Sequence, residues 1–144
     1  MDLREIQPGE TGSAFLAMKE LRTQLSDEAE FVRLVDEVQR PEGYRIVGAF
    51  DPEEQPAAAV AGFRIGNNLA DGHYLYVDDL ATRPEFRRRG LGTALLVWLA
   101  REAARLGCDH LSLDSAVGLE RADAHRLYLN SGLVITAHHF ARKL

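Results

Sequence analysis

The chain has 144 residues, of which 46% are hydrophobic, and this length and composition suit one compact domain with a hydrophobic core. Its 17 Lys and Arg residues are outnumbered by 22 Asp and Glu residues, and the net charge of -5 argues against a protein that binds nucleic acid by broad phosphate neutralisation. The N-terminus lacks a basic start before an apolar core, and no window approaches the roughly 20 apolar residues of a membrane span. We therefore expect one soluble, cytoplasmic domain over residues 1–144, with no nucleic-acid or membrane partner.

The N-terminal half predicts a strand, two helices and a hairpin. Residues 2–6 (DLREI) alternate between apolar and polar side chains, as in a short strand. Residues 13–25 and 28–39 carry apolar side chains at helical spacing, which indicates two amphipathic helices. Two β-favouring segments, 44–50 and 57–66, flank a polar turn at 51–56 (DPEEQP) and so predict a hairpin.

The C-terminal half predicts a change from antiparallel to parallel strand order. A third long strand at 73–82 extends the hairpin into a meander, and the apolar stripe of 92–106 then predicts a helix that ends at Gly107. A strand at 110–115 and a helix at 120–130 follow, and the last residues, 133–144, read as two short strands. Because a strand, a helix and a strand follow one another, two of these strands must be parallel neighbours. The fold class is α/β (mixed α+β), with about seven mostly antiparallel strands and about four helices.

The cysteine and histidine residues do not form a metal-ligand pattern. A single cysteine, Cys108, excludes an internal disulfide, and its place between a helix and a strand favours a small buried thiol. His138 and His139 are adjacent, so a strand would point them to opposite faces. We predict no metal site.

Residues 87–93 (RRRGLGT) join the third long strand to a helix, where unpaired backbone N–H groups attract anions. Gly90 and Gly92 lack a Cβ atom, so a phosphate can approach the backbone closely. On this chemistry alone, a solvated helix start with its arginines in water has equal weight. The P-loop pattern does not fit because no lysine precedes Thr93, and the dinucleotide-binding fingerprint does not fit because Leu95 takes the place of its third glycine.

A third pattern does fit these residues. The RRRGLG stretch resembles the R/Q-x-x-G-x-G/A pyrophosphate loop of the GNAT N-acetyltransferase superfamily, with Arg87 in first place and Gly90 and Gly92 as its glycines. The segment DAHRLYLNSGL, residues 123–133, is similar to the A-x-x-F/L-Y-x-x-x-G-F/L segment of the same family, and the element order agrees along the whole chain. The matching positions in that segment are Ala124, Leu127, Tyr128, Gly132 and Leu133. Together with HHFARKL at the end, it is most similar to a bacterial branch that includes aminoalkylphosphonate N-acetyltransferases.

The resemblance implies an enzyme that uses acetyl-CoA as acyl donor and a primary amine, on a small molecule, a lysine or a protein N-terminus, as acceptor. The amine would attack the thioester directly in a ternary complex. The pyrophosphate would lie on the amides of residues 88–93, and the pantetheine arm would pair with residues 80–82. The implied cofactor-binding residues are Leu80, Ala81, Thr82, Arg87, Arg88, Arg89, Gly90, Leu91, Gly92, Thr93 and Tyr128. Arg121 stands where other branches carry a cofactor-contacting asparagine. Related folds frequently form dimers through C-terminal strands, so a homodimer is left open.

Tyr128 is the first candidate for the general acid. The family's matching tyrosine commonly protonates the departing thiolate, and a phenol with a pKa near 10 is protonated at neutral pH. Without the motif, a tyrosine on an amphipathic helix is more simply a core aromatic residue.

The general base is less defined by the sequence. Many family members carry a glutamate where this chain has Tyr76. Asp78 is the first choice, because it lies two residues further on the same side of an unbulged strand, with Asp79 on the opposite side. There are alternatives to Asp78 as the general base: a water relay could take the proton, the amine could arrive already neutral, or both aspartates could have a purely structural role. The imidazoles of three histidines, His125, His138 and His139, are further alternatives.

Two other functions compete with the enzyme. A sensor or scaffold would bind CoA or acyl-CoA without turnover. A nucleic-acid protein would use the run Arg87–Arg88–Arg89 and bind with steep salt dependence, which the net charge disfavours.

Overall fold

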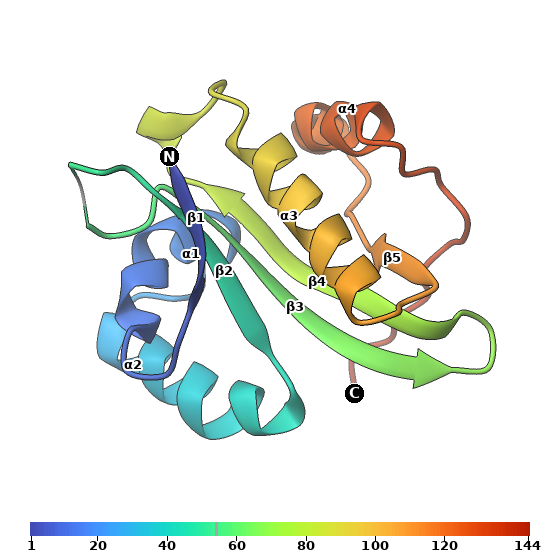
Figure 1. Cartoon of the computed structure of the whole chain (residues 1–144), viewed down its shortest axis with the longest axis horizontal. Coiled ribbons are helices and arrows are strands. Elements are labelled where there is room, and N and C mark those ends of the chain that lie inside the picture. Colours follow the sequence, from blue (N-terminus) through green and yellow to red (C-terminus); the bar gives the residue numbers. More distant parts are fainter. Residues whose placement is uncertain (54) are drawn as a thin grey trace.

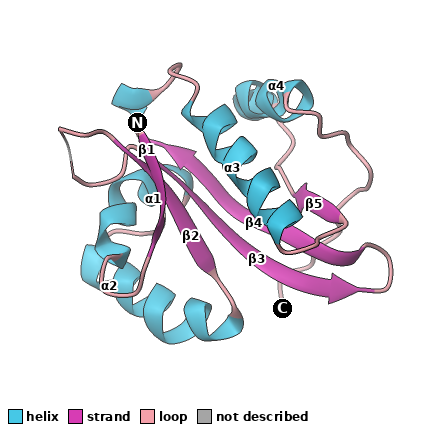
Figure 2. Cartoon of the chain, in the orientation of Figure 1, coloured by secondary structure: helices cyan, strands magenta, loops and turns pink. Residues whose placement is uncertain are grey.

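The computed structural model describes residues 1–53 and 55–144 and shows a central twisted sheet with helices on both faces (Figure 1, Figure 2). The sheet has five strands in the order β1-β2-β3-β4-β5. Its strands are β1 (Asp2–Ile6), β2 (Arg45–Phe50), β3 (Ala59–Asn68), β4 (Gly72–Thr82) and β5 (His110–Leu113). The α-helices are α1 (Phe15–Leu21), α2 (Glu28–Arg33), α3 (Leu91–Arg105) and α4 (Ala122–Asn130). The predicted α/β class is confirmed.

Strands β1 to β4 form an antiparallel meander, and β5 then adds to β4 in parallel. The predicted parallel pair is therefore confirmed. It is short: four residue pairs join β4 to β5, from Tyr74↔His110 to Val77↔Leu113. Because β4 continues to Thr82, its second half extends beyond the partner strand.

Two hydrophobic cores lie on the two faces of the sheet. On one face α3 buries Leu95 and Leu99 against strand residues that include Phe63 and Leu75. On the other face α1 and α2 bury Phe15 and Phe31, together with a second set of strand side chains. Burial of each large apolar side chain stabilises the folded state by about 1.5–3 kcal/mol. The row of apolar residues along one face of α3 is therefore sufficient to hold this helix on the sheet.

Three expectations about secondary structure need correction. About seven strands were expected, but residues 134–144 form no strand, because no ladder of backbone hydrogen bonds joins them to β5 in the part of the chain that the structure describes. The helix expected over 28–39 is α-helical only to Arg33, and a π-helix (Leu34–Gln39) continues it. The turn expected at 51–56 includes Glu54, which lies outside the described residues.

In the described ranges, 1–53 and 55–144, no helix combines the length and the apolar character that a membrane crossing needs.

Candidate active site

A cleft opens where β4 and β5 separate. Pairing between the two strands ends at Val77 and Leu113, and a cavity of about 390 Å³ begins there. Its walls come from the second half of β4, the loop after β5, the end of α1, the turn just before α4, and Tyr128 near the end of α4. The residues lining it are Glu20, Leu21, Arg22, Val77, Asp78, Asp79, Leu80, Leu113, Asp114, Ser115, Ala116, Glu120, Arg121 and Tyr128.

The second half of β4 offers one free edge. Leu80, Ala81 and Thr82 pair with β3 on one side. On the other side, no strand lies against them among the described residues, since β5 has already ended. Backbone N–H and C=O groups on such an edge are able to pair with an extended ligand as another strand would.

The loop before α3 leaves backbone N–H groups without partners. Gly90 has a left-handed φ of +76° and directly precedes the helix, and no side chain caps it. Arg88 also has a positive φ, of +63°. Within the described chain, no hydrogen bond is made by the N–H groups of residues 88–93. The start of α3 therefore has the unsatisfied donors that bind an anion.

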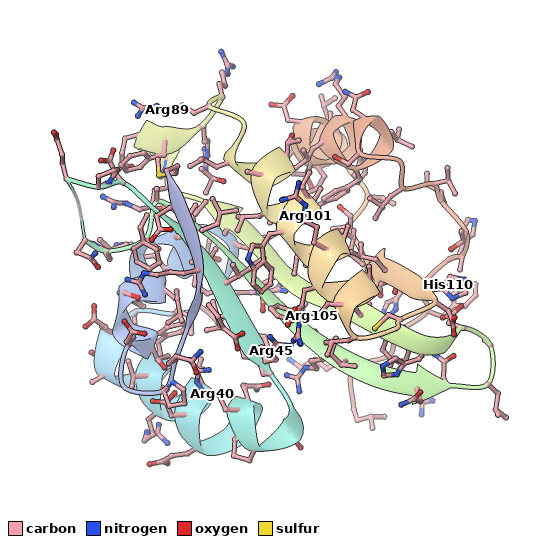
Figure 3. The ribbon with its side chains drawn as sticks, viewed as in Figure 1. Arg40, Arg45, Arg89, Arg101, Arg105 and His110 are labelled. Carbon is pink, nitrogen blue, oxygen red and sulfur yellow. The ribbon has the colours of Figure 1, made fainter. Side chains whose placement is uncertain are left out.

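The arginines of this loop point to different environments. Arg87, Arg88 and Arg89 are all exposed. The guanidinium of Arg89 lies 5.1 Å from the ring centroid of Phe86, which is buried beneath it (Figure 3). This stacking holds Arg89 beside the loop, while the other two side chains extend into solvent.

Gly90 and Gly92 lack a Cβ atom for different reasons. A Cβ at Gly90 would have nothing within 4 Å, so this glycine serves the left-handed turn. A Cβ at Gly92 would lie 2.8 Å from the Cδ2 atom of Leu127, so this glycine lets α4 pack closely on α3. Close approach of a phosphate, the role expected for Gly92 from the sequence, does not include this contact between the two helices.

Tyr128 lies on α4 and lines the cavity, half-buried. Burial raises the pKa of its phenol, and neighbouring Arg121 opposes that rise. The phenol is therefore protonated at neutral pH and is able to donate a proton into the cavity.

A bulge in β4 brings both aspartates to the cavity. Gly62 pairs with Asp79 and the next residue, Phe63, pairs with Val77, so Asp78 is an extra residue without a partner in β3. An unbulged strand would turn Asp78 and Asp79 to opposite faces, and that expectation is wrong. Both side chains line the cavity.

Asp78 is only partly satisfied by its neighbours. Its Oδ2 atom accepts a hydrogen bond from Arg64 Nε at 2.8 Å. Its Oδ1 atom is buried and has no hydrogen-bond partner among the described residues. Burial raises the pKa of this carboxyl above its usual value, and Arg64 opposes the shift. One oxygen of Asp78 is thus buried without a hydrogen bond to offset the burial.

Asp79, in contrast, has both oxygens engaged. Oδ1 accepts from Arg22 Nε at 2.7 Å and Oδ2 accepts from the Tyr44 hydroxyl at 2.6 Å. Arg22 follows the last residue of α1 and also donates to the backbone carbonyl of Asp78. Asp79 therefore fixes the end of α1 on the bulge.

Sequence reasoning missed Arg22, Tyr44 and Arg64, which come from separate elements. One signal was present: a Cβ on Gly62 would lie 1.8 Å from the Tyr44 hydroxyl oxygen. A glycine inside a strand often marks such a close approach.

The three histidines considered as bases lie in different places. His125 Nε2 lies 3.1 Å from Ser115 Oγ and 3.0 Å from the carbonyl oxygen of Ala116, so it holds the loop after β5 against α4. His139 Nδ1 lies 2.9 Å from Asp114 Oδ2, at the rim of the cavity. His138 is exposed on the C-terminal segment. In the described residues, no group of three or more His, Cys, Asp or Glu side chains is arranged to hold a metal ion.

A separate ionic cluster, which we call the Glu102 cluster, consists of Glu5, Arg45, Glu102 and Arg105 and lies outside the cavity. Arg45 bonds to Glu5, with a shortest distance of 2.6 Å from Nη2 to Oε1, and also to Glu102. Arg105 Nε donates to Glu102 Oε1 at 2.6 Å, and Figure 3 shows Arg45 and Arg105 near each other beside α3. Hydrogen bonds from Arg105 and Arg45 lower the pKa of Glu102 to about 2.

Comparison with curated proteins finds acetyltransferases. The chain is 26% identical over 127 residues to the thialysine N-epsilon-acetyltransferase of Bos taurus, covering 77% of this chain and 72% of that protein. It is 31% identical over 68 residues to the aminoalkylphosphonate N-acetyltransferase of Salmonella typhimurium, covering 47% of this chain and 43% of that protein.

Comparison with solved structures finds the same fold. A transcriptional regulator from Bacillus halodurans superposes with a TM-score of 0.82 at 18% identity, covering 99% of both chains. An aminoglycoside N-acetyltransferase in complex with CoA superposes with a TM-score of 0.78 at 16% identity, covering 99% of this chain and 93% of the other. Residues 13–133, which include the whole cavity, match the Acetyltransferase (GNAT) family, and the chain therefore belongs to that family of acyltransferases.

Proposed function

We propose that this protein transfers the acetyl group of acetyl-CoA to the primary amine of a small, positively charged acceptor. One observation carries the proposal: Tyr128 and Asp78 both line the cleft between β4 and β5, and one oxygen of Asp78 has no hydrogen-bond partner among the described residues. A proton donor and a proton acceptor are the two groups that amide formation from a thioester needs.

The acyl donor fits two features of the chain that lie next to each other along the sequence. The free edge of residues 80–82 suits the pantetheine arm, whose amides pair like a strand. The unpaired N–H groups of residues 88–93 suit a pyrophosphate, and Arg87, Arg88 and Arg89 add positive charge around it. The likeness to an acetyltransferase fold solved with CoA supports this assignment.

The chemistry then divides between Asp78 and Tyr128. The bound ammonium ion first loses one proton to solvent. Its neutral nitrogen then forms a bond to the carbonyl carbon of the thioester, and the carbon–sulfur bond breaks. Asp78 accepts the proton that the nitrogen loses, and its raised pKa makes it a stronger base than an ordinary aspartate. Tyr128 donates a proton to the departing sulfur and recovers one from solvent. Asp79 is a positioning residue, since both of its oxygens are occupied.

The acceptor side of the cavity is acidic. Five of its lining residues are Asp or Glu and two are Arg, and after the Arg22–Asp79 ion pair is removed four acidic residues and one arginine remain. An ammonium ion gains from this charge and an anionic acceptor does not. The relative named for thialysine has an amine-bearing acceptor in its name, which supports an aliphatic amine here.

The direct test is release of free thiol from acetyl-CoA with a panel of amines, read together with the mass of the product. We expect turnover with aliphatic primary amines and a product heavier by one acetyl group. Aminoalkylphosphonates, which carry the opposite charge at one end, serve as the matched comparison and should react more slowly. Stabilisation by acetyl-CoA without thiol release for any amine would contradict the proposal and indicate a CoA-binding sensor instead.

A further inference from the structure

Arg64 of β3 donates hydrogen bonds from all three of its guanidinium nitrogens. Nε donates to Asp78 Oδ2 at 2.8 Å, and Nη2 donates to the side-chain oxygen of Gln39. Nη1 donates to the backbone carbonyl of Glu42 at 3.4 Å. These acceptors belong to the bulge of β4, the end of the π-helix and the short 3₁₀ turn that follows it. Because a planar guanidinium bonded at three nitrogens has one orientation, Arg64 presents a fixed donor to Asp78.

The strand register explains why Arg64 reaches Asp78. Arg64 pairs with Tyr76 across the β3–β4 ladder, and Asp78 lies two residues further along β4. A long side chain reaches such a diagonal neighbour on an antiparallel strand. The bulge leaves Asp78 without a partner residue in β3, so side-chain contacts have to fix the direction of its carboxylate.

The π-helix that holds Arg64 is itself anchored to the rest of the fold. Asp36 in this helix accepts hydrogen bonds from the hydroxyl of buried Thr11 at 2.7 Å and from Arg40 Nε at 2.9 Å. Arg40 also donates to a backbone carbonyl of β1 at 3.0 Å. π-Helical turns are rare and frequently lie at functional sites, and this one ends at Gln39, which accepts from Arg64.

Arg64 is also the main positive charge beside Asp78. The titratable groups that act on Asp78 from its own strand and from neighbouring elements are Arg64, Arg22, Tyr44, Tyr76 and Asp79. Burial raises the pKa of the Asp78 carboxyl, and the hydrogen bond and charge of Arg64 oppose that rise more strongly than the charge of Arg22 does. Arg22 is already paired with Asp79, so Asp78 depends chiefly on Arg64 for compensation.

We propose that Arg64 is a positioning residue for acetyl transfer, which fixes the Asp78 carboxylate in one orientation and supplies its neighbouring positive charge, while Gln39 holds Arg64 in place. The proposal rests on the proposed function, in which Asp78 is the base. Arg64 does not line the cavity, so it acts through Asp78 and not on the acceptor. Without Arg64, neither oxygen of Asp78 would keep a hydrogen bond among the described residues.

The first test follows the Asp78 carboxyl itself, by ¹³C NMR titration of the full chain, with Asp78→Asn used to assign its signal. Arg64→Gln removes the charge and should move the titration midpoint to higher pH by about one pH unit. Arg64→Lys keeps the charge and should restore most of the shift. Arg33→Gln, at an exposed side chain at the end of α2, is the matched control and should leave the midpoint unchanged. An unchanged midpoint in Arg64→Gln would overturn the proposal.

The second test measures kcat/KM across the same pH range. The acidic limb in Arg64→Gln should move with the Asp78 midpoint, so kcat/KM should be about 10-fold lower below both midpoints and should recover as the pH rises. A loss that is equal at every pH would mean only damage to the fold and would overturn the proposal. A limb that stays while the carboxyl midpoint moves would instead contradict Asp78 as the base, and with it the proposed function.

The third test removes the support of Arg64 and leaves every charge in place. Gln39→Ala should move the Asp78 midpoint in the same direction as Arg64→Gln, by a smaller amount, because the guanidinium then loses one of its three acceptors. Val38→Ala, at an exposed neighbour in the same π-helix, is the matched control and should have no effect. An unchanged midpoint in Gln39→Ala would overturn the role of Gln39.

Discussion

Asp78 and Glu102 are carboxylates in two regions of the molecule, and their surroundings shift the carboxyl pKa in opposite directions. Glu102 accepts hydrogen bonds from Arg45 and Arg105, and its pKa falls to about 2. Asp78 has one arginine and one buried oxygen without a partner among the described residues, and burial raises its pKa. The first arrangement lowers the free energy of the folded state, whereas the second leaves one buried carboxylate oxygen without a hydrogen bond.

The contrast separates stability from chemistry. Substitutions at the cavity should reduce turnover and leave the free energy of unfolding nearly unchanged. Substitutions at the Glu102 cluster should do the reverse. Variants in each region therefore test whether turnover and stability depend on different residues.

The largest effect is expected at the proposed general acid. Tyr128→Phe removes the phenolic proton that the departing sulfur takes, so kcat should fall by about 10²–10⁴-fold. Acetyl-CoA affinity, measured by titration calorimetry, should stay within about 2-fold because the ring remains. The matched control is Tyr74→Phe in the β3–β4 hairpin, outside the cavity lining, and it should keep full turnover. Unchanged kcat in Tyr128→Phe would remove this residue from its role.

Asp78→Asn should lower kcat/KM by about 10²-fold. The carboxylate must be deprotonated to act, so in the unmodified enzyme kcat/KM should fall as the pH decreases through the raised pKa of Asp78. The variant should lack that acidic limb. Asp123→Asn, on the exposed face of α4, should retain it. An acidic limb that persists in Asp78→Asn would assign the limb to another group.

Glu102→Gln should lower the free energy of unfolding by about 2 kcal/mol, because it weakens charged hydrogen bonds from two arginines. Since the folded-state pKa is lowered from 4.5 to about 2, this stabilisation is present above pH 4.5 and is lost as the pH falls toward 2. Urea unfolding at several pH values measures both effects, with exposed Glu30→Gln as the control. Reduced kcat in Glu102→Gln would break the separation of the two regions.

A smaller effect is expected at Gly92, which lies between the two regions. Gly92→Ala brings a Cβ atom to 2.8 Å from Leu127, at the flexible end of that side chain, and should cost about 1 kcal/mol of stability. The double variant Gly92→Ala/Leu127→Ala should show a favourable coupling free energy in a double-mutant cycle. Purely additive effects would mean that the two residues do not press on one another.

The sequence was informative where local pattern decides structure. Hydrophobic periodicity predicted the apolar face of α3 and the antiparallel meander, and turn chemistry predicted the glycine at the start of α3. The RRRGLG motif indicated the family. The arrangement around Asp78 was not accessible in this way. The bulge depends on how β3 and β4 align, and Arg22, Tyr44 and Arg64 reach the aspartates from three elements far apart in the chain.

The C-terminal segment shows another limit of pattern. Two short strands were expected there, but a strand needs a partner edge, and residues 134–144 have none within the described chain. Propensity alone therefore gave too many strands. Gly92 shows the same limit at a single residue, because its close neighbour Leu127 lies 35 positions away.

The central claim is that acetyl-CoA binds between the free edge of β4 and the start of α3. Titration of the ¹⁵N-labelled full chain with acetyl-CoA, followed by amide chemical shifts, tests it most directly. We expect the largest shifts at residues 80–82 and 88–93, with smaller shifts around Tyr128. No saturable shift at all, or shifts concentrated around residues 130–133, which line a separate cavity between α3, β5 and the turn after α4, would contradict the account.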